Sequence, residues 1–262
     1  MKRLLYFILT MTVVIPIQLI AQVPTTETKI PDSGNRTDSN GNKIGYWTEK
    51  VGEITFKGEY IENKKVKNWI GYHPNNMIAK IEYFNYGLKD GISIQFDKKG
   101  KITVVENFKN GLAHGQATYY SQYNESPSSE TEYAFGKKNG VYRQYYENGK
   151  IQEESWFKDD LKNGLSTWNN KNGQPVAEYN YKAGNFDGLQ KTFYAKDTLQ
   201  SVENYKDNQL FGEFSEYFRD GKLKTSGKYI NGQKDGTWTE YNELGKIEKV
   251  TRFKNGTELN KK

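Results

Sequence analysis

Aromatic, aliphatic and glycine positions recur in this chain with a period of about 24 residues, starting near residue 45. The glycines that open successive units are separated by 24, 25, 24, 24, 24 and 24 residues, and they are Gly91, Gly115, Gly140, Gly164, Gly188, Gly212 and Gly236. An earlier unit at Lys67 keeps the aromatic positions without the glycine, and a shorter unit begins at Gly45, so the pattern comprises nine units. A period of this length indicates a repeat protein whose units stack side by side.

Two further glycine positions indicate two tight turns in each unit. Counted from the opening glycine as offset zero, offset nine holds Gly100, Gly149, Gly173, Gly221 and Gly245, and offset twenty holds Gly87, Gly111, Gly184, Gly232 and Gly256. Several of these glycines follow Asn or Asp, and such pairs between short aromatic runs are typical of type I′ hairpin turns. We therefore expect two short strands and two type I′ turns per unit.

Apolar side chains occupy three columns of the repeat. Offset five holds Tyr72, Phe96, Tyr120, Tyr145, Phe193, Tyr217 and Tyr241; offset eleven holds Ile78, Ile102, Ile151, Leu199, Leu223 and Ile247; offset seventeen holds Phe84, Phe108, Phe157, Tyr181, Tyr205, Tyr229 and Phe253. Offsets eleven and seventeen differ by an even number, so an unbulged strand would place both columns on one face. Because a lone hairpin is marginally stable, stability has to come from stacked units.

The fold class that follows is all-β. We predict an elongated single-sheet meander or solenoid of about nine 24-residue β-hairpin repeats, with about eighteen short strands. An aromatic and aliphatic ladder is expected along one face of this sheet.

The N-terminal part of the chain has a different character. Lys2 and Arg3 precede an apolar run over residues 4–20 that ends before Ala21, so residues 1–21 are predicted to be a signal peptide. We expect export to the periplasm, the cell surface or the medium. Leu19 stands where a small residue is preferred, and an uncleaved N-terminal anchor is the alternative. Residues 22–42 lack an apolar period and predict a disordered linker, followed by the repeat domain over residues 43–258 and a tail over residues 259–262.

Composition excludes several kinds of chemistry. The chain has no cysteine, which rules out disulfides, thiolate catalysis and zinc–thiolate sites. Removal of the signal lowers the formal net charge from +6 to +4, so no nucleic-acid partner is expected. The two histidines, His73 and His114, lie in predicted turns outside any catalytic motif. We expect no catalytic, cofactor or metal site, and the protein is not expected to be an enzyme.

Three acidic residues share offset fifteen, namely Glu82, Glu106 and Glu203. Equivalent positions in successive hairpins lie two strand spacings apart, about 9.5 Å. Oxygen atoms that share one calcium ion must lie within about 5 Å of each other. A cation ladder is therefore not expected, and these carboxylates are predicted to lie on a solvated face and pair with lysines.

The repeating unit resembles a known family. The runs YYENGK from Tyr145 to Lys150 and FKNG from Phe108 to Gly111 are similar to the MORN repeat, particularly the bacterial variant in proteins labelled antitoxin components of toxin–antitoxin systems. The likeness covers about residues 41–256. It implies a non-catalytic scaffold that mediates protein–protein interaction, antitoxin-like by this resemblance alone, and MORN-type repeats have also been proposed to bind membranes.

One unit departs from the pattern and is a candidate binding region. The fourth unit is one residue longer, has no turn glycine and includes Pro127. Tyr119, Tyr120 and Tyr123 lie at the base of its hairpin, and Tyr145 continues the aromatic column. Loops that break a repeat often carry specificity. These tyrosines are therefore the candidate contacts to a protein partner, and a tolerated insertion without a binding role is the alternative.

A row of lysines is the second candidate. Each follows the aromatic residue at offset seventeen, and the row includes Lys109, Lys158, Lys182 and Lys206. Such charges keep strand ends soluble and unpaired, or they meet an anionic polymer. The alternative function is therefore a carbohydrate-binding or anionic cell-envelope or lipid-binding module that uses the aromatic and lysine rows, with an envelope polysaccharide or anionic lipid as partner.

Overall fold

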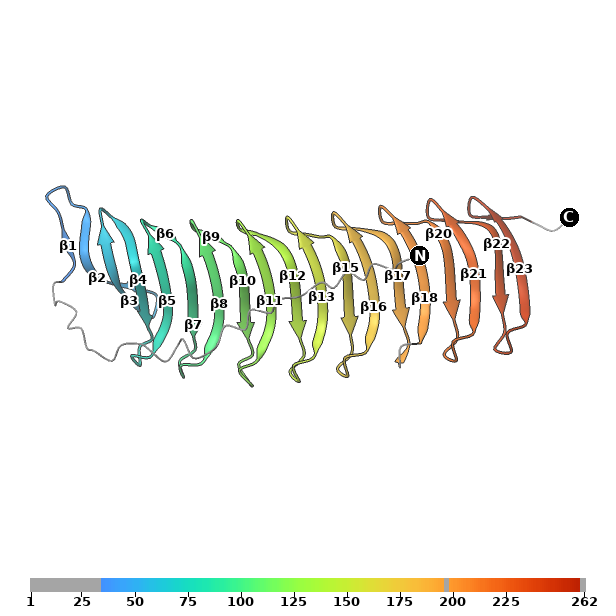
Figure 1. Cartoon of the computed structure of the whole chain (residues 1–262), viewed down its shortest axis with the longest axis horizontal. Coiled ribbons are helices and arrows are strands. Elements are labelled where there is room, and N and C mark those ends of the chain that lie inside the picture. The colour runs from blue at the N-terminus through green and yellow to red at the C-terminus, as the bar shows by residue number, and fades with distance from the viewer. Residues whose placement is uncertain (1–33, 196–197, 260–262) are drawn as a thin grey trace, which may run out of the picture. The chain divides into compact units, whose positions relative to one another are not determined.

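The computed structural model describes residues 34–195 and 198–259, which form one continuous antiparallel sheet (Figure 1). The strands follow one another along this sheet in chain order. The predicted signal peptide lies outside the described residues.

The sheet has 24 strands. They are β1 (Arg36–Thr37), β2 (Lys43–Val51), β3 (Ile54–Ile61), β4 (Lys64–Tyr72), β5 (Ile78–Asn85), β6 (Leu88–Lys89), β7 (Gly91–Phe96), β8 (Ile102–Lys109), β9 (Leu112–Ala113), β10 (Gly115–Tyr120), β11 (Pro127–Ala134), β12 (Lys137–Tyr145), β13 (Ile151–Lys158), β14 (Leu161–Lys162), β15 (Gly164–Asn169), β16 (Pro175–Lys182), β17 (Asn185–Phe193), β18 (Leu199–Lys206), β19 (Gln209–Leu210), β20 (Gly212–Tyr217), β21 (Leu223–Ile230), β22 (Gln233–Tyr241), β23 (Ile247–Lys254) and β24 (Thr257–Glu258).

Eighteen of these strands have six to nine residues and pair as nine hairpins, while six strands have only two residues. The nine hairpins, numbered as repeats 1 to 9, are β2–β3, β4–β5, β7–β8, β10–β11, β12–β13, β15–β16, β17–β18, β20–β21 and β22–β23. The predicted all-β sheet of hairpin repeats is confirmed. Most of the two-residue strands lead into the next long strand and are separated from it by the residue before the opening glycine. That glycine has positive φ, as Gly91 does at 112°.

The two turns of each repeat are of different kinds. At offset twenty both central residues have positive φ, for example Asn110 at 50° and Gly111 at 83°, which is the predicted type I′ geometry. At offset nine only the glycine has positive φ, as in Gly100 at 85°, so the type I′ prediction is wrong there. In that turn the Gly100 amide donates to the Asp97 carbonyl, and the Asp97 carboxylate accepts the amides of Lys99 and Lys101. By accepting these backbone amides, the Asp97 carboxylate stabilises a turn in which only one residue has positive φ.

A β-bulge follows the offset-nine turn in eight of the nine hairpins. In repeat 3, Phe96 pairs with Ile102 whereas Gly91 pairs with Phe108. Because alternate residues of the regular strand β7 point to opposite faces, Ile102 and Phe108 lie on opposite faces of the sheet. The predicted single ladder is therefore wrong, and the offset-eleven aliphatic residues belong to the other face.

The type I′ turns are bonded to one another along one edge of the sheet, and we call this row of bonds the turn seam. The second residue of each turn donates its amide to the carbonyl of the residue two positions beyond the preceding turn, as in Gly111 to Lys89 at 2.7 Å and Gly184 to Lys162 at 2.8 Å. The donors are Asn63, Gly87, Gly111, Gly136, Asp160, Gly184, Asn208, Gly232 and Gly256. The seam satisfies backbone groups that a row of isolated hairpins would expose.

The core lies on the face that carries the offset-seventeen aromatics, which we call the packed face. Trp69 is fully buried and stacks edge-on against Tyr60, with Phe84 buried beside them. Gly58 lies directly beneath the Trp69 indole, where any Cβ atom would clash with the ring. Trp238 lies over Gly227 in the same way near the other end. Both indoles donate to the carbonyl that follows the glycine, Glu59 and Lys228 respectively.

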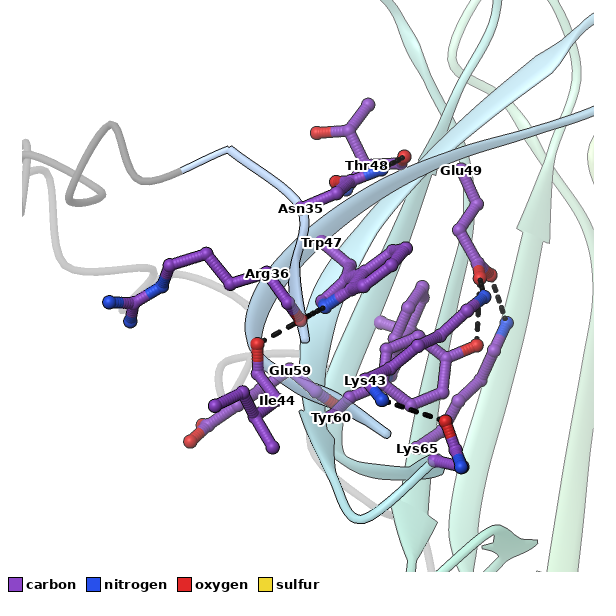
Figure 2. Close-up of polar contacts among 12 residues, drawn as sticks. Asn35, Arg36, Lys43, Ile44, Trp47, Thr48, Glu49, Glu59, Tyr60 and Lys65 are labelled. Atoms are coloured by element: carbon purple, nitrogen blue, oxygen red, sulfur yellow. Dashed lines mark hydrogen bonds and ion pairs between the residues drawn. The ribbon is translucent and has the colours of Figure 1, made fainter. Parts of the chain in front are cut away.

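Residues just before the first repeat also pair with the sheet. The Asn35 side chain exchanges two hydrogen bonds with the Thr48 backbone, and the Arg36 carbonyl accepts the Trp47 indole N–H (Figure 2). The Asp38 carboxylate accepts the amides of Asn40 and Asn42. The predicted linker over residues 22–42 thus ends in a segment, residues 34–42, whose polar side chains bind backbone groups.

Candidate functional site

The four candidate tyrosines do not form one surface. Tyr119 and Tyr120 end β10 and point to opposite faces, Tyr123 lies in the following turn, and Tyr145 ends β12. The Tyr145 hydroxyl donates to Glu130 at 2.8 Å. Burial and this hydrogen bond raise the pKa of Tyr145 to about 12. Of the four, Tyr123 is the most exposed, at 86%.

The turn of repeat 4 is held from both sides. Glu125 adopts φ of 58° where five other repeats have glycine, and its carboxylate pairs with Lys101 of the preceding repeat at 2.7 Å. The Asn124 side chain donates to the Glu147 carbonyl of the following repeat. Tyr123 is therefore carried by a turn that is fastened to its neighbours.

The candidate lysines lie at the opposite edge, next to the turn seam. Lys109, Lys158, Lys182 and Lys206 are the last residues of β8, β13, β16 and β18, and all four are exposed. Three of them occupy successive repeats, about 9.5 Å apart. The structure thus separates the tyrosine and lysine candidates onto two edges of the sheet.

A second lysine column, on the packed face, was missed by the sequence analysis. It consists of Lys43, Lys65, Lys89, Lys138, Lys162 and Lys234, each two residues before the opening position of a repeat. Each ammonium lies over aromatic rings; Lys65 Nζ is 3.9 Å from the Trp69 ring centroid and Lys234 Nζ is 4.1 Å from that of Trp238. We call this set the packed lysine column. The repeated lysine in GNKIG, GLKDG and GQKDG was the available signal.

Carboxylates complete this column at several repeats. Glu82 is only 7% exposed and binds Lys80 at 3.1 Å and Lys89 at 2.7 Å. Burial opposes its ionisation, but the hydrogen bond from Lys89 and the charges of both lysines hold the pKa of Glu82 below its ordinary value. For Glu82 the predicted pairing with lysines is present, whereas the predicted solvated face is wrong because Glu82 lies across from the buried Trp69. Glu106 and Glu203 make no ion pair within residues 34–195 and 198–259.

Glu49 makes the same kind of contact at the start of the sheet. It binds Lys43 at 2.6 Å and Lys65 at 3.2 Å, and it accepts the Tyr60 hydroxyl at 2.8 Å (Figure 2). Burial, followed by the hydrogen bond to Glu49, raises the pKa of Tyr60 above its ordinary range. An ammonium over an aromatic ring with a carboxylate beside it is thus a recurring arrangement in this chain.

The packed lysine column is interrupted at Ala113 and at the consecutive positions Phe186 and Leu210. There a recess of about 140 Å³ opens on the packed face, lined by Tyr179, Phe186, Gln190, Thr192, Ser201, Glu203 and Tyr205. Phe186 packs between Tyr179 and Tyr205, with ring centroids 5.5 and 5.4 Å away. Glu203 accepts the Tyr205 hydroxyl at 3.0 Å, and no ion pair reaches it within the described ranges.

A patch of exposed apolar side chains lies along the turn seam at repeats 2 to 4. It consists of Tyr86, Leu88, Leu112 and Phe135, which are 63%, 52%, 48% and 66% exposed. A leucine methyl of Leu88 lies against Gly111, and one of Leu112 lies against Gly136. We call these four residues the turn-edge patch. The sequence analysis did not identify it, although Tyr-Gly and Phe-Gly in place of Asn-Gly were visible signals.

Each of the two histidines contacts a residue of the next repeat. His73 Nε2 lies 3.1 Å from the Phe96 carbonyl of the next repeat, and the His114 ring lies 5.0 Å from that of Phe135. Over residues 34–195 and 198–259, no group of three or more acidic or histidine side chains is arranged to hold a metal ion. No helix with the length and hydropathy of a membrane span occurs in these ranges either.

Comparison with known proteins identifies the repeat. The family model described as "MORN repeat variant" matches residues 89–110, 138–159, 162–183, 186–207, 212–231 and 234–255. The same hairpins continue through β2–β5 and β10–β11, outside these segments. Among curated proteins, no match was found.

A solved structure titled "Crystal structure of GtfA/B complex" aligns with 47% of this chain and 20% of that chain, at 15% identity and a TM-score of 0.16. A likeness at that level bears on neither fold nor function. Repeats of the MORN type generally serve as interaction modules for proteins or membranes, and their scaffold is typically non-catalytic. With its sequence period, its nine hairpins and six matched segments, the chain is a MORN-repeat protein of the variant-repeat type.

Proposed function

We propose that this chain is an exported, non-catalytic repeat scaffold that binds another protein through the turn-edge patch. The carrying observation is that two large aromatic residues occupy the first type I′ position, Tyr86 with φ of 43° and Phe135 with φ of 49°. Bulky side chains are disfavoured at positive φ, where the equivalent turns have Asn110, Asn231 or Asn255.

These aromatic side chains contribute little to folding, because both are largely exposed. Their backbone conformation costs on the order of 1 kcal/mol each relative to Asn or Gly. Exposed apolar groups that cost stability are typical of contact surfaces. Leu88 and Leu112 extend the patch between the two aromatics, so it spans three successive turns.

The test is a double variant, Tyr86→Asn with Phe135→Asn. We expect unchanged or slightly raised thermal stability together with loss of the partner captured by crosslinking in the native host and identified by mass spectrometry. Tyr123→Ala is the matched control, because it removes an exposed aromatic from the opposite edge. If the double variant still captures the partner and Tyr123→Ala does not, the binding site lies at the repeat 4 turn and not at the turn-edge patch.

Export is part of the same proposal and has a separate test. It rests on the basic and apolar pattern of residues 1–21. The mass of the protein recovered from the envelope or the medium should correspond to cleavage after Ala21. Recovery of the intact chain from the cytoplasm would contradict export and would suit the antitoxin-like role that the family resemblance implies.

The exposed lysine row supports a second candidate function, binding to an anionic envelope polysaccharide or lipid. Lys109, Lys158 and Lys182 are absent from the ion pairs of the described residues and lie on one edge. Retention on anionic vesicles or isolated cell-wall material should weaken with salt, because exposed charges are screened. Replacement of Lys158, Lys182 and Lys206 by Glu should abolish retention, and retention unaffected by salt and by this variant would remove the candidate.

A further inference from the structure

The recess at Glu203 lacks the two lysines that flank the equivalent carboxylate of repeat 2. Glu203 and Glu82 occupy the same repeat position, and each lies across its hairpin from offset two of the same repeat, as the pairs Gln190–Glu203 and Trp69–Glu82 show. Glu82 is flanked by Lys80 and Lys89. The residues equivalent to these two lysines beside Glu203 are Ser201 and Leu210.

The aromatic walls of the recess remain in place. Phe186 replaces a lysine of the packed column and holds its ring between those of Tyr179 and Tyr205. The polar groups at its floor are already paired: Gln190 bonds both backbone groups of Asn180, and Thr192 shares a hydrogen bond with Ser201. Among the described residues that line the recess, Glu203 alone is charged.

We propose that this recess binds a primary alkylammonium group, with Glu203 as its counter-ion and the rings of Tyr179, Phe186 and Tyr205 as its walls. The chain provides its own template, because six lysines of the packed column lie over aromatic rings and several of them bind a carboxylate. An ammonium group over an aromatic face gains more when it is partly desolvated, as it is here. The volume of about 140 Å³ is smaller than that of drug-sized ligand pockets and suits a single side chain.

Two sources could supply this chemistry, the side chain of a lysine in a peptide and a free aliphatic diamine. The inference is independent of the turn-edge patch and of its partner. It is therefore tested with defined small probes, so that a failure here leaves the proposed scaffold function unaffected, and the reverse holds as well.

The test is a titration of the isotope-labelled repeat protein with Nα-acetyl-lysine methylamide, followed by NMR. The side-chain amide of Gln190 and the backbone amides of Ser201 and Glu203 should shift with millimolar affinity. Nα-acetyl-norleucine methylamide, which lacks the ammonium, should bind at least about tenfold more weakly. A parallel titration with 1,5-diaminopentane that gives the same shifts supports any alkylammonium as ligand, and shifts with the lysine probe alone support a peptide lysine.

Two variants remove the site in different ways. Ser201→Lys introduces the equivalent of Lys80 and should occupy the recess from within, and Glu203→Gln removes the counter-ion. Each variant should weaken the binding of Nα-acetyl-lysine methylamide at least about tenfold. Glu213→Gln is the matched control, because Glu213 loses one charge on the opposite face of β20 and should leave binding unchanged.

Some results would overturn the proposal. These are equal binding of the norleucine probe, absence of shifts at the Gln190 amide, or an unchanged affinity in Glu203→Gln. Because Glu203→Gln is nearly isosteric, it keeps the test informative if Ser201→Lys alters the fold.

Discussion

The repeats near either end of the described sheet fill the packed face differently from those in the middle. At offset two, repeats 2 and 9 carry Trp69 and Trp238, each lying over a glycine of the preceding repeat. At the same offset, repeats 3 and 6 carry the small buried residues Ser93 and Ser166. Offset two of the repeat can therefore hold either an indole packed over a glycine or a small side chain paired with a larger one. Packing energy is expected to be concentrated near the two ends.

The largest expected effect breaks the end packing. Trp69→Ala removes a fully buried indole that contacts Tyr60 and donates to Glu59, and should destabilise the first hairpins by about 3–5 kcal/mol. Urea unfolding together with hydrogen exchange of the β3–β5 amides measures this loss. Trp156→Ala is the control, since this indole is 48% exposed on the other face and should cost less than about 1 kcal/mol. Similar losses in both variants would refute the concentration of packing at the ends.

The next effect concerns the glycine beneath the other indole. Gly227→Ala places a methyl group where it clashes with the Trp238 ring. The expected loss in the free energy of unfolding is about 1–3 kcal/mol from overpacking. The backbone of Gly227 does not have positive φ, so the side chain alone is the cause. A double-mutant cycle with Trp238→Leu should recover most of the loss. Additive effects in that cycle would show that the two residues do not share this contact.

A smaller effect distinguishes two buried serines in the middle of the sheet. The Ser166 hydroxyl is buried and has no hydrogen-bond partner among the described residues, so Ser166→Ala should be neutral or stabilising by up to about 1 kcal/mol. The Ser155 hydroxyl donates to Glu153 at 2.7 Å, and Ser155→Ala should cost about 1 kcal/mol. Equal changes in the midpoint of urea unfolding would remove this distinction.

The smallest expected effect is a pH dependence of the repeats near the N-terminal end. The pKa values of Glu49 and Glu82 are lowered, so their stabilisation is present above the ordinary glutamate pKa and is lost as pH falls through the folded values. The melting temperature should therefore fall on acidification below about pH 4.5, within the range where glutamates titrate. Glu82→Gln should flatten this dependence, and an unchanged profile would show that the Glu82 ion pairs do not contribute.

The sequence pattern predicted the repeat count, the number of long strands and the offset-twenty turns, because glycine geometry and a 24-residue period leave few alternatives. The bulge after the other turn was not predictable from the alternation of side chains. The bulge reverses the face to which the following residues of the strand point. Alternation without a bulge predicts Ile102 and Phe108 on one face, whereas they lie on opposite faces. The Trp69–Gly58 and Trp238–Gly227 pairs did leave a signal, since a glycine outside the turn positions precedes each tryptophan by eleven residues.

The site was less predictable than the fold. Tyr123 lies in the irregular hairpin of repeat 4, but the turn that exposes it is held by contacts from Lys101 and Glu147 in neighbouring repeats. The packed lysine column was overlooked because lysine is usually assigned to solvent, whereas here the aromatic rings support its ammonium groups. The recess at Glu203 is visible only as a departure from that column.

The turn seam has a consequence for how such a chain can change in length. Each repeat brings one amide donor for the repeat before it and one carbonyl acceptor for the repeat after it. A tandem duplication or deletion of a whole unit therefore restores a complete seam at the new junction. The extra residue of repeat 4 is accommodated at the opposite edge, where no such row of backbone bonds has to be kept in step. The turn seam therefore fixes the unit length at one edge of the sheet, and the opposite edge can accept insertions.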